Sequence, residues 1–180
     1  KIFGERLGFE IEHVQLDKNI SEKEIIEKIR IFNKDIFTNG IIIQLPLPKN
    51  IDQLKLLEEI DPIKDVDGMH SKNISLILNG DMSGIIPATT KGILSLLDFY
   101  NIKISGKKVL ILGRSSLVGR PTALSFINQD ATVTICHSKS NKIKEEIKKS
   151  DIIISAIGKP NFIKKDSVKK TKKDSAKTTE

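Results

Sequence analysis

Two glycines and a serine follow a short apolar run near the middle of the sequence, in the order Gly113, Ser115 and Gly119. The apolar run, residues 109–112, has the length and the branched side chains of a strand buried on both faces of a parallel sheet. Pro121 and an apolar-periodic stretch come next, so the chain is expected to turn sharply and begin a helix with free N–H groups facing the turn. Such N–H groups at the start of a helix bind phosphate.

The spacing Gly-x-Ser-x-x-x-Gly departs from the usual Gly-x-Gly-x-x-Gly, so its context decides the interpretation. A second expected strand, residues 131–136, lies at the distance that a βαβ unit requires, which favours a dinucleotide site over a tight turn in some other α/β protein. An NAD site usually has an acidic residue after this strand, but here His137, Ser138 and Lys139 follow, and Arg114 is available from the first turn. Two cations and a hydroxyl suit a 2′-phosphate, so the sequence predicts NADP.

Gln44 ends a second continuous apolar run, residues 41–45. The carboxyl ends of parallel strands are where open α/β sheets bind ligands. Pro46 and Pro48 prevent the strand from continuing and fix the backbone just beyond it. Gln44 is therefore either a ligand-binding side chain or a solvent-facing amide at a rigid strand exit.

Asp61, Asp65 and Asp67 place three carboxylates within seven residues that also include a proline and end beside Gly68. This composition is typical of a loop with a constrained backbone. The carboxylates could be solvated turn residues, or one could face a ligand. A metal site is a third reading, but the spacing matches no EF-hand or zinc pattern and His70 is the only nearby histidine, so we expect no metal.

The elements expected around these residues alternate between strands and helices. Helices are expected at residues 1–7, with Gly8 as the C-cap, and after the Ser21-x-x-Glu24 capping signal. Further helices are expected at 51–59, at 93–100, which has threonines at its N-cap, and at 141–149. Strands are also expected at 11–16 and 151–158, and residues 71–86 look irregular. The pattern predicts an α/β fold with two domains, 1–100 and 101–163, and a cleft between them, a preferred place for small-molecule sites. Residues 164–180 carry too few apolar side chains for a core and are expected to be disordered.

Composition excludes several classes of function. The chain has 180 residues, a net charge of +7, 38% hydrophobic and only 4% aromatic residues. Its lysines are not interleaved with aromatic side chains, so we expect no nucleic-acid partner. No apolar run reaches membrane-spanning length, no signal peptide is visible, and the single cysteine, Cys136, falls in an expected strand as a small core residue. We therefore expect a soluble cytoplasmic protein.

Four motifs in order, GIIIQLPLP, DPIKDVDG, PATTKGI and the long stretch KISGKKVLILGRSSLVGRPTALSFINQDATVTICHSKS, resemble one family. It is the bifunctional methylenetetrahydrofolate dehydrogenase/methenyltetrahydrofolate cyclohydrolase family, and the resemblance runs from Lys1 to about Lys165. It implies two α/β domains, the second a Rossmann-like parallel-sheet dinucleotide-binding domain, with folate in the cleft.

The resemblance implies an activity. An enzyme of this family is an NADP-dependent oxidoreductase and a hydrolase of one-carbon tetrahydrofolate metabolism and purine biosynthesis, oxidising 5,10-methylenetetrahydrofolate to 5,10-methenyltetrahydrofolate and hydrolysing this to 10-formyltetrahydrofolate, as a homodimer. The alternative is an inactive dinucleotide-binding module that acts as a sensor or partner domain.

The resemblance also implies roles for individual residues. Gln44 would lie beside the reacting ring and orient a catalytic lysine, and Asp67 would bind the pterin; both are expected in the catalytic site. The substrate-binding set is Ile43, Gln44, Leu45, Pro46 and Asp67. The cofactor-binding set is Thr89, Gly113, Arg114, Ser115, Gly119, His137, Ser138 and Lys139, in which residues 113–115 hold the pyrophosphate and 2′-phosphate and residues 137–139 close the ribose end.

The sequence departs from the family pattern at three places. Pro87-Ala88-Thr89-Thr90 replaces the usual Pro-Cys-Thr-Pro, a change that leaves Thr89 in place. The family's Tyr-x-x-x-Lys would end just before Lys1, which is one residue out of register, and its Pro-Gly-Gly-Val-Gly-Pro loop and returning helix are replaced by a lysine- and threonine-rich tail. The chain is therefore expected to be truncated at both ends, to bind NADP weakly and to lack both activities by itself.

Overall fold

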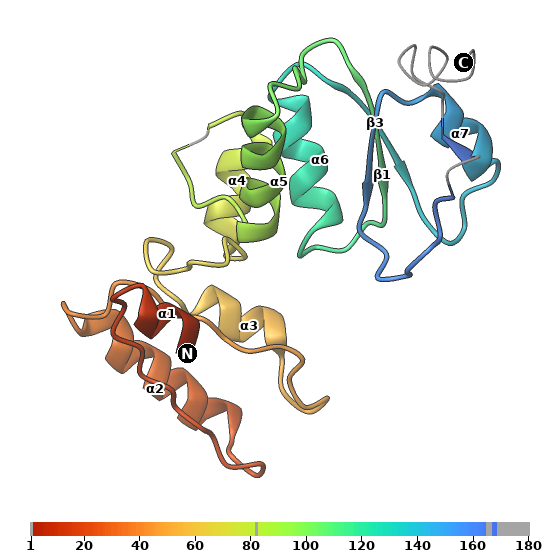
Figure 1. The fold of residues 1–180 in the computed structure, drawn as a ribbon. Coiled ribbons are helices and arrows are strands. Elements are labelled where there is room, and N and C mark those ends of the chain that lie inside the picture. Colours follow the sequence, from red (N-terminus) through yellow and green to blue (C-terminus); the bar gives the residue numbers. More distant parts are fainter. Residues whose placement is uncertain (1, 82, 165–166, 169–180) are drawn as a thin grey trace, which may run out of the picture.

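The computed structural model describes residues 2–81, 83–164 and 167–168. Lys1 and most of the tail that the sequence predicts to be disordered lie outside the described residues. The elements follow in the order α1 (Ile2–Arg6), α2 (Glu22–Lys34), α3 (Gln53–Glu58), α4 (Ser71–Leu78), α5 (Ala88–Phe99), β1 (Lys108–Leu112), α6 (Gly119–Ile127), β2 (Thr132–Cys136), α7 (Ile143–Lys149) and β3 (Ile152–Ser155) (Figure 1).

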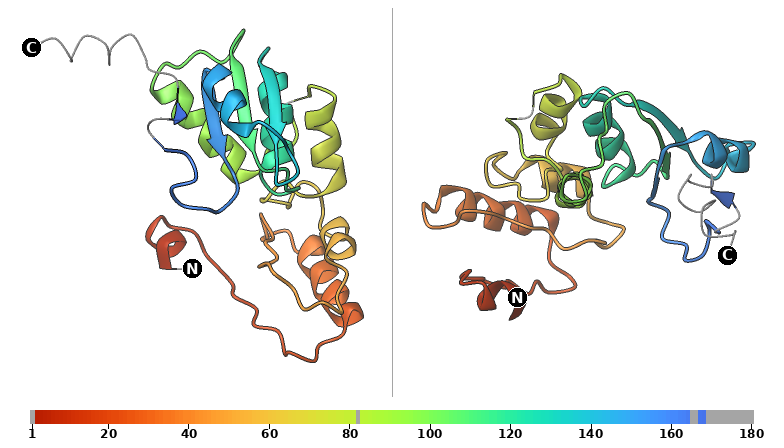
Figure 2. Two further views of the ribbon diagram at one scale, coloured as in Figure 1. Left: turned by 90° about the vertical axis from the view of Figure 1, so that its right-hand side faces the viewer. Right: turned by 45° about the horizontal axis from the view of Figure 1, so that its top comes forward.

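The three strands form one parallel sheet in the order β2-β1-β3, which confirms the predicted α/β class. Side chains of β1 alternate between two cores, as the pleat of a strand requires. Val109 and Ile111 pack with α6 and α5 on one face, while Leu110 and Leu112 pack with Cys136 and α7 on the other. Figures 1 and 2 show α5 and α6 on one side of the sheet and α7 on the opposite side. β1 is therefore the buried central strand that its composition predicts.

The α2–α3 region forms a separate core of aliphatic side chains. Its buried members are Ile25, Ile26, Ile29, Leu56, Leu57 and Ile60. The capping box predicted at the start of α2 is present, because the Ser21 hydroxyl accepts from the Glu24 N–H and the Glu24 carboxylate accepts from the Ser21 N–H. Gly8, with a φ of +85°, ends the first helix as predicted.

Two strand predictions in this region are wrong. Residues 11–16 form no strand, and residues 41–45 contribute only an isolated parallel bridge between Ile41 and Asp65, with the Ile41 N–H donating to the Lys64 carbonyl over 2.7 Å. An apolar β-branched run favours an extended chain, but a strand also needs a neighbour with which to exchange hydrogen bonds. Within the described residues, all the strands of the sheet lie between Lys108 and Ser155.

Two helices also differ from the predictions. Residues 71–78, expected to be irregular, form α4, whose N-cap is His70: its side chain accepts a hydrogen bond from the Lys72 N–H. Helix α5 begins at Ala88 instead of residue 93, so its threonines lie inside the first turn and the N-cap position is occupied by Pro87. Thr90 is fully buried and shares a hydrogen bond of 2.9 Å with Thr122 of α6, so α5 is fastened to α6 by paired hydroxyls.

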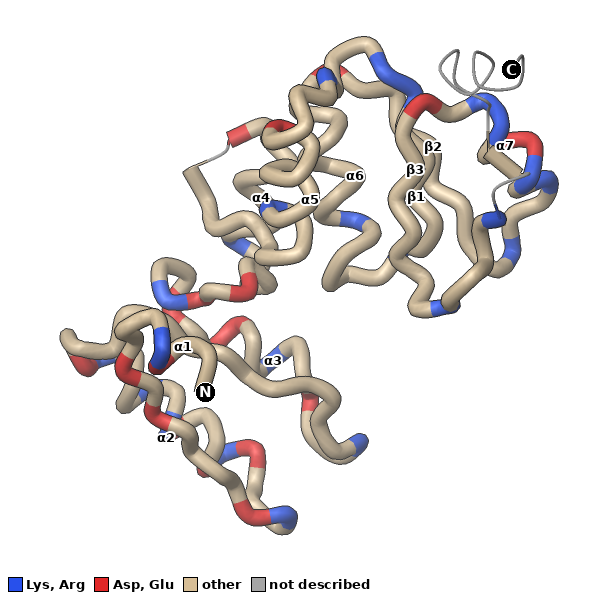
Figure 3. Tube along the Cα trace, in the orientation of Figure 1, with Lys and Arg blue, Asp and Glu red and all other residues tan. Residues whose placement is uncertain are grey.

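The distribution of charge follows the elements. Figure 3 shows basic and acidic residues interleaved along the trace, including α7, which carries acidic residues in its first turn and lysines in its last. That order matches the helix dipole. In the part of the chain that the structure describes, no helix combines the length and apolar character needed to cross a membrane.

Candidate functional site

The turn that leaves β1 begins at Gly113, in a conformation that favours glycine. Its φ is +112°, and a Cβ there would lie 2.6 Å from the Ala156 carbonyl oxygen. The Gly113 N–H donates to the Cys136 carbonyl over 2.8 Å, which keeps the turn attached to β2. The strand exit is therefore closed on both sides by backbone, and only a residue without a side chain fits it.

The same turn meets the first residue of α6. A Cβ on Gly119 would collide with the Gly113 carbonyl oxygen and would lie 2.9 Å from the Arg114 Cα. The start of the helix thus lies directly against the strand exit. This close approach of strand, turn and helix N-terminus is the geometry in which a βαβ unit receives a pyrophosphate.

Ser115 shapes this turn through three hydrogen bonds. Its Oγ accepts from the N–H groups of Val118 (3.2 Å) and Gly119 (3.3 Å), and its carbonyl accepts from the Arg120 N–H over 3.0 Å. The helix N–H groups that the sequence predicts to be free for phosphate are therefore partly used by the serine. These two bonds lie at and just beyond the long end of the usual N–H···O range. An anionic oxygen, because of its charge, is a stronger acceptor for these N–H groups than the hydroxyl.

The turn after β2 supplies the other predicted cofactor residues. The His137 N–H donates to Ser140 Oγ over 2.9 Å, the Ser140 N–H returns to the His137 carbonyl over 2.8 Å, and the Lys139 N–H donates to His137 Nδ1 over 3.1 Å. Ser138 and Lys139 are exposed at the tip of this turn.

The two turns lie at one edge of the sheet. Leu112 and Cys136 are partners in the parallel register, so Gly113 and His137 leave adjacent strands side by side. The structure therefore brings together at this edge Gly113, Arg114, Ser115, Gly119, His137, Ser138 and Lys139. Thr89 lies on a different element, exposed in the first turn of α5.

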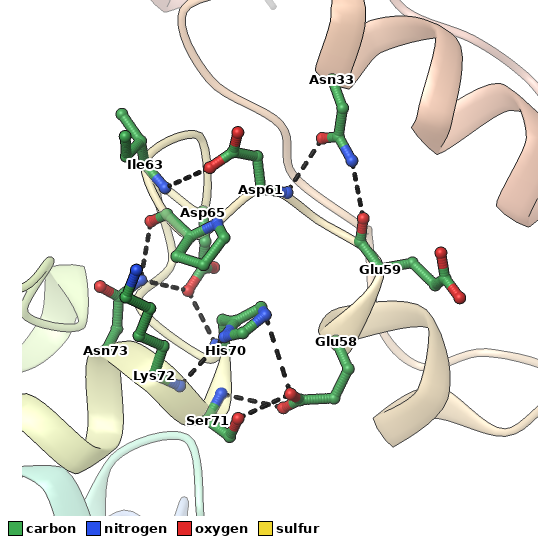
Figure 4. Close-up of polar contacts among 11 residues, drawn as sticks. Asn33, Glu58, Glu59, Asp61, Ile63, Asp65, His70, Ser71, Lys72 and Asn73 are labelled. Carbon is green, nitrogen blue, oxygen red and sulfur yellow. Dashed lines mark hydrogen bonds and ion pairs between the residues drawn. The ribbon is translucent and has the colours of Figure 1, made fainter.

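The carboxylate loop, residues 61–68, forms the second candidate site (Figure 4). Asp65 is 1% exposed, and its Oδ2 accepts from the His70 N–H (2.8 Å) and from Asn73 Nδ2 (3.0 Å). A buried carboxylate without hydrogen-bond donors would carry a large desolvation cost, which these two donors offset. Asp65 is thus a buried, hydrogen-bonded carboxylate that organises the loop, a role that the sequence does not distinguish from those of its neighbours.

Asp67 has a different environment from Asp65. It is half-buried, and burial, followed by the negative charge of nearby Asp65, raises the pKa of its carboxyl above the ordinary 3.8. The next residue, Gly68, has a φ of +64°, and a Cβ there would lie 2.5 Å from the Ile85 carbonyl oxygen and 2.8 Å from the Pro87 nitrogen. The D-V-D-G motif therefore backs directly onto the chain that enters α5, which joins it to the P-A-T-T motif.

Lys64 fastens the carboxylate loop to α2. Its Nζ donates to three carbonyl oxygens at the end of that helix, those of Phe32 (3.0 Å), Asn33 (2.7 Å) and Asp35 (2.7 Å). A cation at this position also complements the negative end of the helix dipole.

Gln44 is exposed and its Nε2 donates only to the neighbouring Leu45 carbonyl, over 3.1 Å, among the bonds described. The Leu45–Pro46 peptide bond is cis. Ile43 packs against the α2–α3 core and so anchors residues 41–45 to that core. The bridge between Ile41 and Asp65 places this segment beside the carboxylate loop, although no hydrogen bond joins Gln44 to Asp67 among the bonds that the structure describes. Among the described residues, no three His, Cys, Asp or Glu side chains cluster as metal ligands do.

Two models of one family match the chain. The tetrahydrofolate dehydrogenase/cyclohydrolase catalytic domain matches residues 3–67, and the NAD(P)-binding domain of the same family matches residues 87–173. The chain belongs to the tetrahydrofolate dehydrogenase/cyclohydrolase family. The first match contains Gln44 and Asp67, and the second contains all the residues gathered at the sheet edge.

Curated relatives and solved structures agree with this family membership. The chain is 45% identical over 163 residues to the bifunctional protein FolD of Clostridium tetani, covering 91% of the chain and 58% of the relative, and 47% identical over 165 residues to that of Ligilactobacillus salivarius, covering 91% and 57%. The crystal structure of the FolD dehydrogenase/cyclohydrolase from Campylobacter jejuni matches with a TM-score of 0.84 at 39% identity, covering 86% of the chain and 55% of that structure.

A further solved structure is the Trypanosoma brucei FolD enzyme complexed with NADP cofactor and inhibitor, with a TM-score of 0.86 at 31% identity, covering 92% of the chain and 57% of that structure. The chain spans little more than half the length of the curated relatives it matches.

Sequence reasoning missed one polar residue in this family member that the structure makes prominent, Asn73 of α4. It is 3% exposed and lies in the carboxylate-loop network of Figure 4. The signal that could have found it is its position four residues before the buried Ile77, which puts a polar side chain on the apolar face of a helix.

Proposed function

We propose that this family member takes part in the NADP-dependent oxidation of 5,10-methylenetetrahydrofolate to 5,10-methenyltetrahydrofolate and in the hydrolysis of that product to 10-formyltetrahydrofolate. The observation that carries the proposal is the glycine-walled turn between β1 and α6, at the same sheet edge as the turn after β2. The description of the relatives as bifunctional supports an enzyme over an inactive dinucleotide-binding module.

The residues at the sheet edge fit NADP. A Cβ on Gly113 or Gly119 would collide with neighbouring backbone, so the strand exit and the start of α6 lie close together. Without these side chains, backbone N–H groups of the turn can approach a pyrophosphate. Arg114 and Lys139 are both exposed, so both cations can reach a 2′-phosphate. Ser138, directly before Lys139, adds a hydroxyl. When bound, NADP supplies the hydride acceptor; the protein supplies position and charge.

The carboxylate loop fits the pterin end of a folate. An ionised Asp67 accepts two hydrogen bonds from the amino group and ring N–H of a pterin edge. Because the pKa of Asp67 is raised by burial, folate binding is expected to weaken on acidification sooner than it would with an ordinary aspartate. Gln44, with Ile43, Leu45 and Pro46 around it, would orient the general acid/base lysine that the family resemblance implies.

We extend the proposal to the organisation of the protein. Residues 1–100 form the folate-binding part, residues 101–163 the NADP-binding part, with α5 as the connecting helix, and residues 164–180 a tail outside both. The protein acts as a cytoplasmic homodimer whose 10-formyltetrahydrofolate product serves purine biosynthesis.

The test is a turnover assay of the full-length gene product with 5,10-methylenetetrahydrofolate and NADP. We expect the absorbance of reduced cofactor to rise with methenyl product, and methenyltetrahydrofolate to be hydrolysed in a separate assay. NADP binding without turnover of either folate would refute the enzyme and favour the inactive module.

A further inference from the structure

Asn73 uses its whole side-chain amide on backbone and carboxylate partners. Its Nδ2 donates to the Pro62 carbonyl (2.9 Å) and to Asp65 Oδ2 (3.0 Å), and its Oδ1 accepts from the Ile85 N–H (3.2 Å). The side chain is 3% exposed, so water does not replace these partners (Figure 4). One amide thus connects the beginning of the carboxylate loop, the buried Asp65 carboxylate and the chain that enters α5.

These partners fix the chain on both sides of Asp67. Asp65 precedes it by two residues, and Gly68 directly after it packs against the Ile85 carbonyl. The two ends of this short stretch are therefore fixed by contacts that share one residue, Asn73. A shift of the amide would move the loop and the chain before α5 relative to each other, and Asp67 lies between them.

The attachment of α4 to the rest of the molecule does not depend on Asn73. Ile77 is fully buried on the same helix, and its carbonyl accepts from Asn128 Nδ2 of α6 over 2.7 Å. The helix is held against α6 by these contacts, one turn further along. Loss of the Asn73 amide is therefore expected to loosen the loop selectively rather than to detach the helix.

We propose that Asn73 is a positioning residue of the folate site, which acts by fixing Asp67 against the entry to α5. This inference rests on the proposed function. No other side chain of similar size reproduces the arrangement: aspartate has no amide donor for Pro62 and places a second charge beside Asp65, and serine is too short to bridge three partners.

The experiment compares Asn73→Asp and Asn73→Ser with Ser75→Ala, an exposed position on the same helix, in the full-length gene product. In the Asn73 variants we expect the KM for 5,10-methylenetetrahydrofolate to rise about 10- to 100-fold, the range that follows from losing one hydrogen bond to a charged group. We expect kcat to change much less, the Kd for NADP to stay within about twofold, and Ser75→Ala to match wild type. Asn73→Ser keeps the test available if Asn73→Asp does not fold.

A second measurement does not depend on folate. Hydrogen exchange at the Ile85 and His70 amides is expected to accelerate in the Asn73 variants, while the β1 amides keep their protection. The exchanged pair Asp65→Asn with Asn73→Asp restores one carboxylate and one amide, and should recover part of the lost folate affinity.

Two results would overturn the inference: faster exchange at Ile85 with an unchanged folate KM, or a KM and an NADP Kd that rise together, which indicates a merely structural role. Absence of folate turnover in the wild-type protein refutes the proposed function instead, and the inference with it; the exchange data then still report whether the Asn73 contacts hold the loop.

Discussion

Gly119→Ala adds one methyl group at the first residue of α6, where three backbone atoms already occupy the space. The new Cβ would meet the carbonyl oxygen of Gly113, its carbonyl carbon at 2.8 Å and the Arg114 Cα at 2.9 Å. None of these is the end of a flexible side chain, so the strand exit and the helix must move apart. Gly92→Ala in α5 is a matched control, because a Cβ there has nothing within 4 Å.

The two substitutions should change stability in opposite directions. Forcing a methyl group into a packed site typically destabilises by about 1–3 kcal/mol, whereas alanine in a helix interior is more stable than glycine by about 0.5–1 kcal/mol. For a protein of this size 1 kcal/mol shifts Tm by about 2–4 °C. Gly119→Ala should therefore lower Tm by about 2–12 °C, and Gly92→Ala should raise it by about 1–4 °C.

The assay is thermal unfolding of both variants, paired with titration of NADP. Because the displaced turn is the proposed pyrophosphate site, the NADP affinity of Gly119→Ala should fall at least tenfold while that of Gly92→Ala stays unchanged. The reasoning is refuted if Gly119→Ala is as stable as Gly92→Ala, or if it binds NADP as wild type does.

Three other changes test the proposed sites. Neutralising Arg114 or Lys139 should weaken NADP binding about 10- to 100-fold and leave NAD binding nearly unchanged; in titrations of wild type with both cofactors, equal or tighter binding of NAD would contradict the assignment. Gln44→Ala should abolish the cyclohydrolase step while folate binding stays nearly intact, so an unchanged hydrolysis rate of methenyltetrahydrofolate would exclude this role. Asp67→Asn should raise Tm at pH 7, because the folded protein raises the pKa of Asp67 and so holds its charged form at a disadvantage. The gain should shrink as pH falls through the raised pKa of the folded state and vanish only well below 3.8, where Asp67 of wild type is protonated in both the folded and the unfolded state; a Tm below that of wild type at pH 7 would contradict it.

The β1–α6–β2 unit is predictable from the sequence because its signals are local. A continuous apolar run, a glycine at its end and a second run at a fixed distance each specify one part, and the parallel register of the two strands follows. The strand predicted at 41–45 fails for a non-local reason, since a strand depends on a neighbour and the described residues offer this segment only the bridge to Asp65. The helix α4 is missed because it is short, has a histidine as its N-cap, and carries Asn73 on its apolar face.

The carboxylate loop shows which part of a site a sequence leaves open. Asp65 and Asp67 are two residues apart and chemically identical. Only the tertiary structure makes the first a buried carboxylate with two hydrogen-bond donors on Oδ2 and the second a half-buried group with a raised pKa. The sequence locates the loop correctly as a constrained turn. The difference between its carboxylates comes from α4, which the sequence does not predict.

The three hydrogen bonds from Lys64 to the end of α2 couple the carboxylate loop to the helix, so that the two are expected to move together. Each hydrogen bond from a charged donor contributes about 1.5–3 kcal/mol, and the three carbonyls are grouped around one nitrogen. Pulling the loop away would break all three bonds together and remove the Lys64 ammonium group from the end of α2. Closure of the loop over a ligand, with α2 fixed, would therefore cost the free energy of these three hydrogen bonds. A ligand that enters beside Asp67 must therefore either fit the loop in its present position or move α2 together with the loop.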